Sequence, residues 1–209
     1  MKRFITYISM QPENHLKKVR YQPVDDMEIR AKKDVYFPIS LLVDNYAPIG
    51  GEIEILCLKE KENADIERNL ELLKGEIAEI LDDRSVNCTF REILINPEEK
   101  IDTHLATFAQ IIDHIKDEDT VYACATYGTK PIPIIEMMAL DYAYRVKKDV
   151  TIGSVVYGKI DRRNNDLQAK LYDITALFFM SQIVGRLAEQ KVADPEEKIR
   201  QILGLGADE

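Results

Sequence analysis

Residues 120–144, TVYACATYGTKPIPIIEMMALDYAY, run from a strand pattern through a short turn into a helix pattern, and this unit decides the fold. Residues 120–126 are β-branched, aromatic or small, which is typical of a buried strand. Residues 131–148 are apolar on nearly every side, which predicts a helix packed on a sheet and on a second surface, such as a partner subunit. A strand that leads directly into a helix is the unit of an α/β fold.

The turn at residues 126–130, Thr-Tyr-Gly-Thr-Lys, has the chemistry of an anion-binding site. Gly128 permits a sharp turn and lets a ligand approach the main chain. Pro131 and Pro133 suit the first turn of a helix, where backbone N–H groups have no intrahelical partner. Those N–H groups, the helix dipole and the hydroxyl and ammonium groups of the turn can converge on one phosphate. The alternative is a turn that uses glycine and proline for geometry alone.

The pattern of strand followed by helix recurs along the chain. Further strands are predicted at residues 3–9, 51–59, 88–95 and 149–158. Helical spacing of apolar residues predicts helices around residues 38–46, 66–81, 105–115 and 175–187. Strands that alternate with helices pair in parallel through right-handed crossovers, so we expect an α/β fold with a Rossmann-like, doubly wound, mainly parallel sheet. Ligands bind such sheets beyond the carboxyl ends of the strands, where the strand order reverses.

A long segment, residues 10–36, separates the first strand from the first helix and is expected to form a loop or a hairpin. It carries six basic residues, from Lys17 to Lys33, against five acidic ones, and is therefore slightly positive within an acidic chain. Long loops are usually functional or disordered. A solvated excursion whose charges face water is the alternative interpretation.

Composition limits the function classes. The chain has 209 residues, 45% of them hydrophobic, which is enough for one substantial core. Its formal net charge of -9 disfavours general binding to duplex nucleic acid, which needs extended basic surface. No apolar run has the roughly 18 residues of a membrane span, and no signal peptide pattern opens the sequence, so we expect a cytoplasmic protein without a membrane segment. Three widely spaced cysteines indicate reduced core thiols rather than disulfides or a metal site.

Four segments together resemble the CARF domains, the CRISPR-associated Rossmann-fold sensors of type III CRISPR systems. These segments are TYISMQPENHLKKVRYQP (6–23), YFPISLLVDNY (36–46), VYACATYGTKPIPIIEMMALDYAY (121–144) and VVYGKID with LYDITALF (155–161 and 171–178). The likeness covers roughly residues 1–185. It implies a pocket at a two-fold dimer interface that holds a cyclic oligoadenylate. By this resemblance the expected ligand-binding residues are Ser9, Met10, Gln11, Thr126, Tyr127, Gly128, Thr129 and Lys130.

The resemblance implies a sensor that binds a cyclic oligoadenylate second messenger in antiviral defence, with no cofactor. Cyclic tetra-adenylate is the expected ring, because a compact pocket on a small dimer favours four adenylates, and its four phosphates agree with the two-fold symmetry of a homodimer. Adenines could stack on Tyr127 or Tyr7. Residues 1–160 would form the sensing domain. Residues 161–209 would form a helical extension that serves dimerisation or links to a fused or separate effector.

Two alternatives remain open at this stage. The first is a ring nuclease that slowly cleaves the ligand without a metal, by attack of a ribose 2′-hydroxyl on its own phosphate, with catalytic residues unknown. Many relatives carry an acidic residue where this chain has Cys124, and that difference disfavours catalysis. The R-x-x-x-x-H ribonuclease signature of CARF partners is absent from the sequence. The second alternative is an unrelated α/β protein that uses the turn at 126–130 for a mononucleotide.

Overall fold

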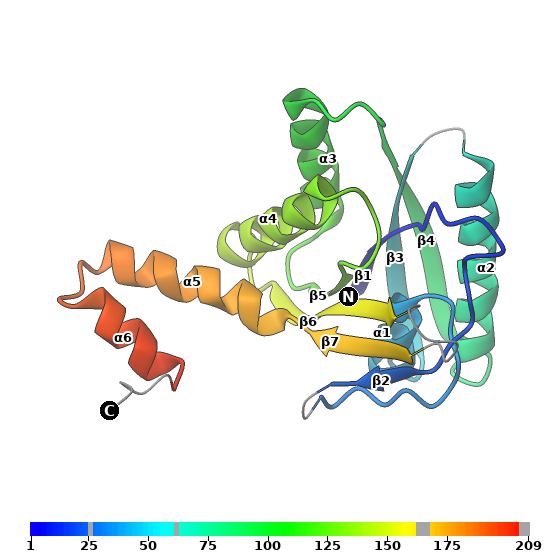
Figure 1. Cartoon of the computed structure of the whole chain (residues 1–209), viewed down its shortest axis with the longest axis horizontal. Coiled ribbons are helices and arrows are strands. Elements are labelled where there is room, and N and C mark those ends of the chain that lie inside the picture. Colours follow the sequence, from blue (N-terminus) through cyan, green and yellow to red (C-terminus); the bar gives the residue numbers. More distant parts are fainter. Residues whose placement is uncertain (25–26, 61–62, 162–167, 205–209) are drawn as a thin grey trace. The chain divides into compact units, whose positions relative to one another are not determined.

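The computed structural model describes residues 1–24, 27–60, 63–161 and 168–204, which form an α/β fold built on one seven-stranded sheet (Figure 1). The strands are β1 (Lys2–Tyr7), β2 (Tyr21–Pro23), β3 (Gly51–Glu60), β4 (Val86–Ile95), β5 (Thr120–Cys124), β6 (Thr151–Asp161) and β7 (Gln168–Asp173). The helices are α1 (Pro38–Tyr46), α2 (Ala64–Leu81), α3 (Ile101–His114), α4 (Pro131–Val146), α5 (Thr175–Glu189) and α6 (Pro195–Ile202). The predicted α/β class is confirmed, and so are all five predicted strands.

The chain divides into two compact units, Met1–Ile174 and Thr175–Glu209. The first unit holds the whole sheet with helices α1 to α4, and the second holds α5 and α6. Strand β7 pairs with β6 in antiparallel register, with Tyr172 opposite Tyr157, so the sheet continues beyond residue 160, where the sequence predicts a helical extension. None of the helices that the structure describes combines the length and the apolar character needed to cross a bilayer.

The strand order is β2-β7-β6-β5-β1-β3-β4, with β1 near the centre. Strands β1, β3, β4, β5 and β6 are mutually parallel, and β2 at the edge runs parallel to β7. The chain winds outward from β1 through β3 to β4, then returns to place β5 on the other side of β1. Helices α1 and α2 pack together on one side of the sheet, and α3 and α4 pack together on the other (Figure 1). The strand order therefore reverses between β1 and β5, as the doubly wound prediction requires.

The central strands are buried because helices cover both faces of the sheet. In β3, every residue from Ile53 to Lys59 is buried, as expected for a parallel strand covered on both sides. On the side of α1, the Tyr122 ring stacks on Phe4 at 5.0 Å and on Tyr46 at 4.7 Å between ring centroids. These stacks join β5, β1 and α1 into one layer of the core.

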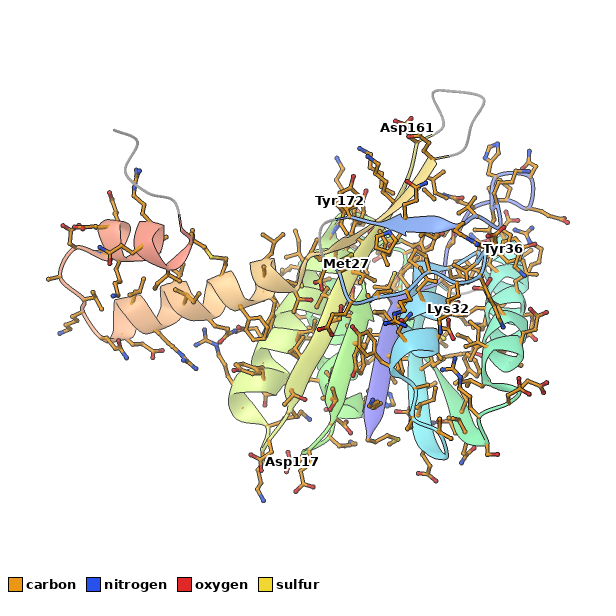
Figure 2. The ribbon with its side chains drawn as sticks, turned by 90° about the horizontal axis from the view of Figure 1, so that it is seen from below. Met27, Lys32, Tyr36, Asp117, Asp161 and Tyr172 are labelled. Atoms are coloured by element: carbon orange, nitrogen blue, oxygen red, sulfur yellow. The ribbon has the colours of Figure 1, made fainter. Side chains whose placement is uncertain are left out.

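A buried cluster of ion pairs stabilises the amino-terminal end of the central strands. The Arg3 guanidinium pairs with Glu54 of β3 and donates from Nε to Asp119 Oδ2 at 2.5 Å. The Asp119 carboxylate also pairs with the amino-terminal ammonium group at 3.2 Å. Figure 2 shows Asp117, just before β5, at this end of the sheet and Asp161 at the other, carboxyl end. Ion pairs thus stabilise the amino-terminal end of the sheet, whereas the loops after β1 and β5 lie at its carboxyl end.

Candidate ligand-binding site

The two loops that the sequence nominates follow neighbouring strands. Strands β1 and β5 pair in parallel with Thr6 opposite Cys124, so residues 9–11 and 126–130 leave the sheet at the same edge. The edge lies at the reversal of strand order, where doubly wound sheets bind their ligands. The fold thus brings the two loops that carry the expected ligand-binding residues to one edge of the sheet.

A cleft of about 340 Å³ opens at this edge. Its lining comes from the first loop, from the edge strand β2, from the turn after β5 and from the carboxyl half of β6. The lining residues are Gln11, Tyr21, Thr126, Tyr127, Tyr157, Gly158, Lys159 and Ile160. Gln11, Thr126 and Tyr127 are therefore predicted residues that share one cavity, whereas Ser9, Met10, Gly128, Thr129 and Lys130 lie outside its lining.

Helix α2 holds the first loop in place. The Asn69 side-chain amide donates to the Ser9 carbonyl at 2.7 Å and to the Gln11 carbonyl at 2.9 Å. Arg68 donates to the same Gln11 carbonyl at 2.9 Å, and the buried Ser9 hydroxyl accepts from the Gln11 N–H at 3.2 Å. Ser9 is thus buried and helps to hold the loop, whereas Met10 is exposed. The hydrogen bonds fix the main chain of Gln11, which lines the cleft.

The Thr126 hydroxyl joins two strands at the floor of the cleft. Its Oγ1 atom accepts from the Gly158 N–H of β6 at 2.8 Å and lies 3.1 Å from the buried Cys124 sulfur. The sequence suggests that this hydroxyl faces an anion, but its first role in the fold is to tie the end of β5 to β6. All three cysteines are free thiols, as predicted, and burial raises the pKa of Cys124 to about 11.

Tyr127 forms one wall of the cleft. Its ring meets Phe37 edge-to-face at 6.3 Å between centroids, and its hydroxyl donates to the Tyr36 carbonyl at 3.3 Å. Burial, followed by the nearby Tyr21, raises the pKa of Tyr127 well above its usual range, so the phenol stays protonated at physiological pH. The ring is therefore a fixed, neutral surface against which a planar group can pack.

Gly128 has the conformation that its role in the turn requires. Its φ is +103°, a backbone conformation that glycine adopts readily and other residues adopt rarely. A Cβ atom there would lie 3.1 Å from Ile132 Cβ and 3.2 Å from Tyr7 Cγ, so the turn packs directly on the end of β1. The Thr129 carbonyl then accepts from the Ile132 N–H at 3.0 Å as α4 begins. Lys130 is exposed beside it and forms no hydrogen bond or ion pair with the described residues.

Five lining residues escape the sequence prediction: Tyr21, Tyr157, Gly158, Lys159 and Ile160. A Cβ on Gly158 would lie 2.4 Å from Pro38 Cγ and 3.0 Å from Tyr21 Cε1, so glycine lets β6 approach α1 and β2 closely. The sequence feature that could have identified these residues is the VVYGKID segment at the end of a predicted strand. Its place at the cleft, however, depends on β6 lying beside β5. Strand neighbours of that kind cannot be read from a local pattern.

Lys159 supplies the positive charge of the cleft. Within the described residues, the lining contains this ammonium group and no carboxylate. Lys159 also lies directly opposite Lys170 of β7, and like charges in such cross-strand pairs destabilise a sheet. Asp161 lines a small hollow with both lysines and offsets part of this repulsion, and an anion bound beside the pair would offset more of it. The arrangement can therefore hold a planar group against tyrosine rings and a negative group beside Lys159.

No model of a protein family matches the chain, and no curated protein matches it. Across the described residues, no three histidine, cysteine, aspartate or glutamate side chains gather as a potential metal site.

Proposed function

We propose that this protein is a sensor that binds a cyclic oligoadenylate, with cyclic tetra-adenylate as the preferred ring, as a homodimer in type III CRISPR defence. The observation that carries the proposal is the cleft at the reversal of strand order, where Gln11 of the first loop and Thr126 and Tyr127 of the second line one cavity. The resemblance of the sequence to CARF domains nominates these same two loops.

The cleft has the groups that one adenylate unit needs. Tyr157, which is 39% exposed, offers a ring on which an adenine can stack. The Gln11 amide can both donate to and accept from an adenine edge. Lys159 can pair with the phosphate. Stacking, edge recognition and charge neutralisation are thereby provided by two residues of β6 and one residue of the first loop.

The size of the cleft supports a dimer. Ligand pockets in proteins usually measure roughly 300–1,000 Å³, and this one has about 340 Å³. It has room for a fraction of a cyclic tetra-adenylate, so a whole ring would need a second copy of the cleft. A two-fold dimer would supply that copy in the orientation that the symmetry of the ring requires.

Helix α4 offers a surface for the second copy. Four apolar side chains recur at every fourth position along its outer side, where they form one stripe: Ile134, Met138, Tyr142 and Val146. Ile134, Met138 and Val146 are 63%, 54% and 61% exposed. Contiguous exposed apolar surface of this kind is typical of a protein–protein interface. The helix begins just after the Gly128 turn, so a two-fold axis near the amino-terminal end of α4 would bring the turns of both copies together.

A ring nuclease is the second candidate. The cyclic ligand carries its own nucleophile, the ribose 2′-hydroxyl, and cleavage requires that this group be held in line with the phosphate. The observation that favours this candidate is the Lys159 ammonium, which has no acidic neighbour in the cleft and could stabilise charge that develops on the phosphate.

One experiment tests both candidates. The purified protein is titrated with cyclic tetra-adenylate, cyclic hexa-adenylate and AMP, while calorimetry gives the stoichiometry, light scattering the mass and chromatography the fate of the ligand. We expect one intact cyclic tetra-adenylate per two chains. Linear products would establish the ring nuclease instead. Binding of AMP alone, at one per monomeric chain, or of no ligand at all, would contradict the proposal.

A further inference from the structure

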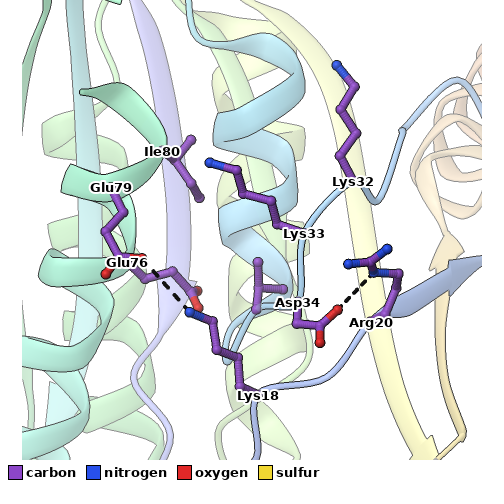
Figure 3. A pocket seen from close by; sticks show the side chains of 9 residues that line it. Lys18, Arg20, Lys32, Lys33, Asp34, Glu76, Glu79 and Ile80 are labelled. Atoms are coloured by element: carbon purple, nitrogen blue, oxygen red, sulfur yellow. Dashed lines mark hydrogen bonds and ion pairs between the residues drawn. The ribbon is translucent and has the colours of Figure 1, made fainter. Parts of the chain in front are cut away.

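A second, larger hollow of about 400 Å³ lies between residues 18–20 and 32–35 on one side and helix α2 on the other, apart from the candidate site (Figure 3). Its lining shares no residue with the cleft at the carboxyl edge. The lining residues are Lys18, Arg20, Lys32, Lys33, Asp34, Val35, Glu76, Glu79 and Ile80. Four of these nine are cationic, in a chain whose formal net charge is -9.

The main chain brings together the segments that carry these cations. Val19 and Val35 form an antiparallel bridge, with N–H to carbonyl distances of 3.0 Å and 2.9 Å. This bridge places the pair Lys18 and Arg20 beside the pair Lys32 and Lys33, although the pairs are separated along the chain. The Lys18 ammonium also stands 5.7 Å from the centre of the Tyr36 ring. The backbone that carries these cations is therefore preformed, which lowers the cost of gathering them around a ligand.

The acidic residues of the hollow already have partners. Asp34 pairs with Arg20 at 2.8 Å, and Glu79 lies 3.9 Å from Lys18. Glu76 is buried and accepts from the Tyr36 N–H at 2.6 Å and from the Phe37 N–H at 3.3 Å. Its carboxyl group thus accepts hydrogen bonds from the main chain just before α1 rather than from a lysine ammonium.

Lys32 and Lys33 remain without an acidic partner. Both are exposed, and neither forms a hydrogen bond or an ion pair within the part of the chain that the structure describes. Figure 3 shows the Lys33 side chain extending toward Ile80 of α2 and the Lys32 side chain pointing away from the other cations, with Arg20 beside Asp34. Uncompensated ammonium groups that share a concave surface attract ligands with several negative charges close together.

We propose that this hollow binds a compact polyphosphate, meaning a ligand with two or more adjacent phosphate groups. Two lysines without partners and two cations in surface ion pairs can each turn toward a different phosphate oxygen. The patch is confined to one hollow of an acidic protein, whereas a nucleic acid strand needs an extended basic track. The inference does not depend on the cyclic ligand of the other site.

Inorganic tripolyphosphate is the probe for this site, with orthophosphate and an oligothymidylate as comparison ligands. Calorimetry on the full chain should show tripolyphosphate binding more tightly than orthophosphate, and the K32A/K33A double variant should weaken it by at least about tenfold. The K100A/K148A variant removes two exposed lysines elsewhere and should bind as the wild type does. E79Q removes the carboxylate opposite Lys18 and should tighten binding about twofold to fivefold, a gain that misfolding could not produce.

Four results would overturn the proposal. Equal weakening in K32A/K33A and K100A/K148A would mean that only net charge matters. Equal affinities for orthophosphate and tripolyphosphate, or binding of the oligothymidylate alone, would exclude a compact polyphosphate as the preferred class. Loss of tripolyphosphate binding in K159A, with K32A/K33A unaffected, would move the binding to the cleft at the carboxyl edge.

Discussion

The Thr126 hydroxyl accepts a hydrogen bond from the Gly158 N–H at 2.8 Å, which joins the end of β5 to β6 beneath the candidate site. Thr126→Val keeps the shape but leaves that N–H without its acceptor. We expect a loss of about 1–3 kcal/mol in the free energy of unfolding, because an unsatisfied buried donor carries its full desolvation cost. Urea denaturation would measure the loss. Thr126→Ser retains the acceptor and should keep most of the stability, so an equal loss in both variants would contradict this role.

Gly128 should tolerate alanine far less than Gly50 and Gly75 do. Its φ of +103° and the contacts that a Cβ would make with Ile132 and Tyr7 predict a loss of roughly 2–4 kcal/mol for Gly128→Ala. Gly50 also has a positive φ, +69°, but a Cβ added there would meet no atom within 4 Å, so Gly50→Ala should lose only about 1 kcal/mol.

Gly75 is a control position at which alanine should stabilise the protein rather than destabilise it. It lies within α2, where a Cβ would meet nothing within 4 Å, so Gly75→Ala should raise the free energy of unfolding by about 0.5–1 kcal/mol. Chemical denaturation of the three variants under one set of conditions gives the ranking. A Gly128→Ala variant as stable as Gly50→Ala would show that the turn after β5 can relax away from β1.

The patterns that are local in the sequence predict the fold well. Residues 53–58 form an apolar run interrupted only by Glu54, and such runs identify buried parallel strands. The glycine and prolines around residue 130 mark the start of α4, and the positive φ of Gly128 confirms the sharp turn expected there. These features depend on backbone preference and burial, which a short stretch of sequence encodes.

The parts that sequence reasoning missed depend on distant pairing. Strand β2 has three residues, one of them Pro23, and becomes a strand only because Tyr21 lies opposite Ala169 of β7. The share of the cleft that β6 contributes likewise depends on its place beside β5. Since strand order is a property of the whole sheet, Tyr157 and Lys159 could be recognised as site residues only in three dimensions.

Glu136 should make stability fall as the pH rises. Its carboxyl group lies on the buried face of α4, its Oε1 atom has no hydrogen-bond partner among the described residues, and burial raises its pKa to about 8. The folded protein keeps the proton between the ordinary pKa of glutamate and the raised value, whereas the unfolded chain releases it. The folded state is therefore penalised increasingly as the pH rises through this range.

Glu136→Gln removes the titrating group, so its stability relative to the wild type should grow by roughly 3 kcal/mol between pH 5 and pH 8, at about 1.4 kcal/mol per pKa unit. Urea denaturation at several pH values measures the difference. Glu196→Gln, at an exposed position of α6, should leave the pH dependence of stability unchanged. If Glu136→Gln follows the wild type at every pH, the Glu136 carboxyl group is not buried in solution.

Met138→Glu should separate dimerisation from recognition of a single nucleotide. A carboxylate in the exposed stripe of α4 would be desolvated in the proposed dimer, so light scattering should give the mass of a monomer. Binding of the cyclic ligand should fall with the dimer, whereas weak AMP binding in the cleft should remain. Ala109→Glu, at an exposed position of α3, is the matched control. A dimer that survives Met138→Glu would place the interface elsewhere.

Lys159 should contribute more to ligand binding than Lys130. Only Lys159 lines the cleft, so Lys159→Ala should weaken cyclic tetra-adenylate binding by about 1.5–3 kcal/mol, the range for a hydrogen bond to a charged group. The same variant removes the repulsion with Lys170 and should gain about 0.2–1 kcal/mol in the free energy of unfolding without ligand. This opposite sign distinguishes a binding role from a structural one. If Lys130→Ala weakens binding more than Lys159→Ala, the phosphate lies at the start of α4, and the ring extends beyond the cleft to the Gly128 turn.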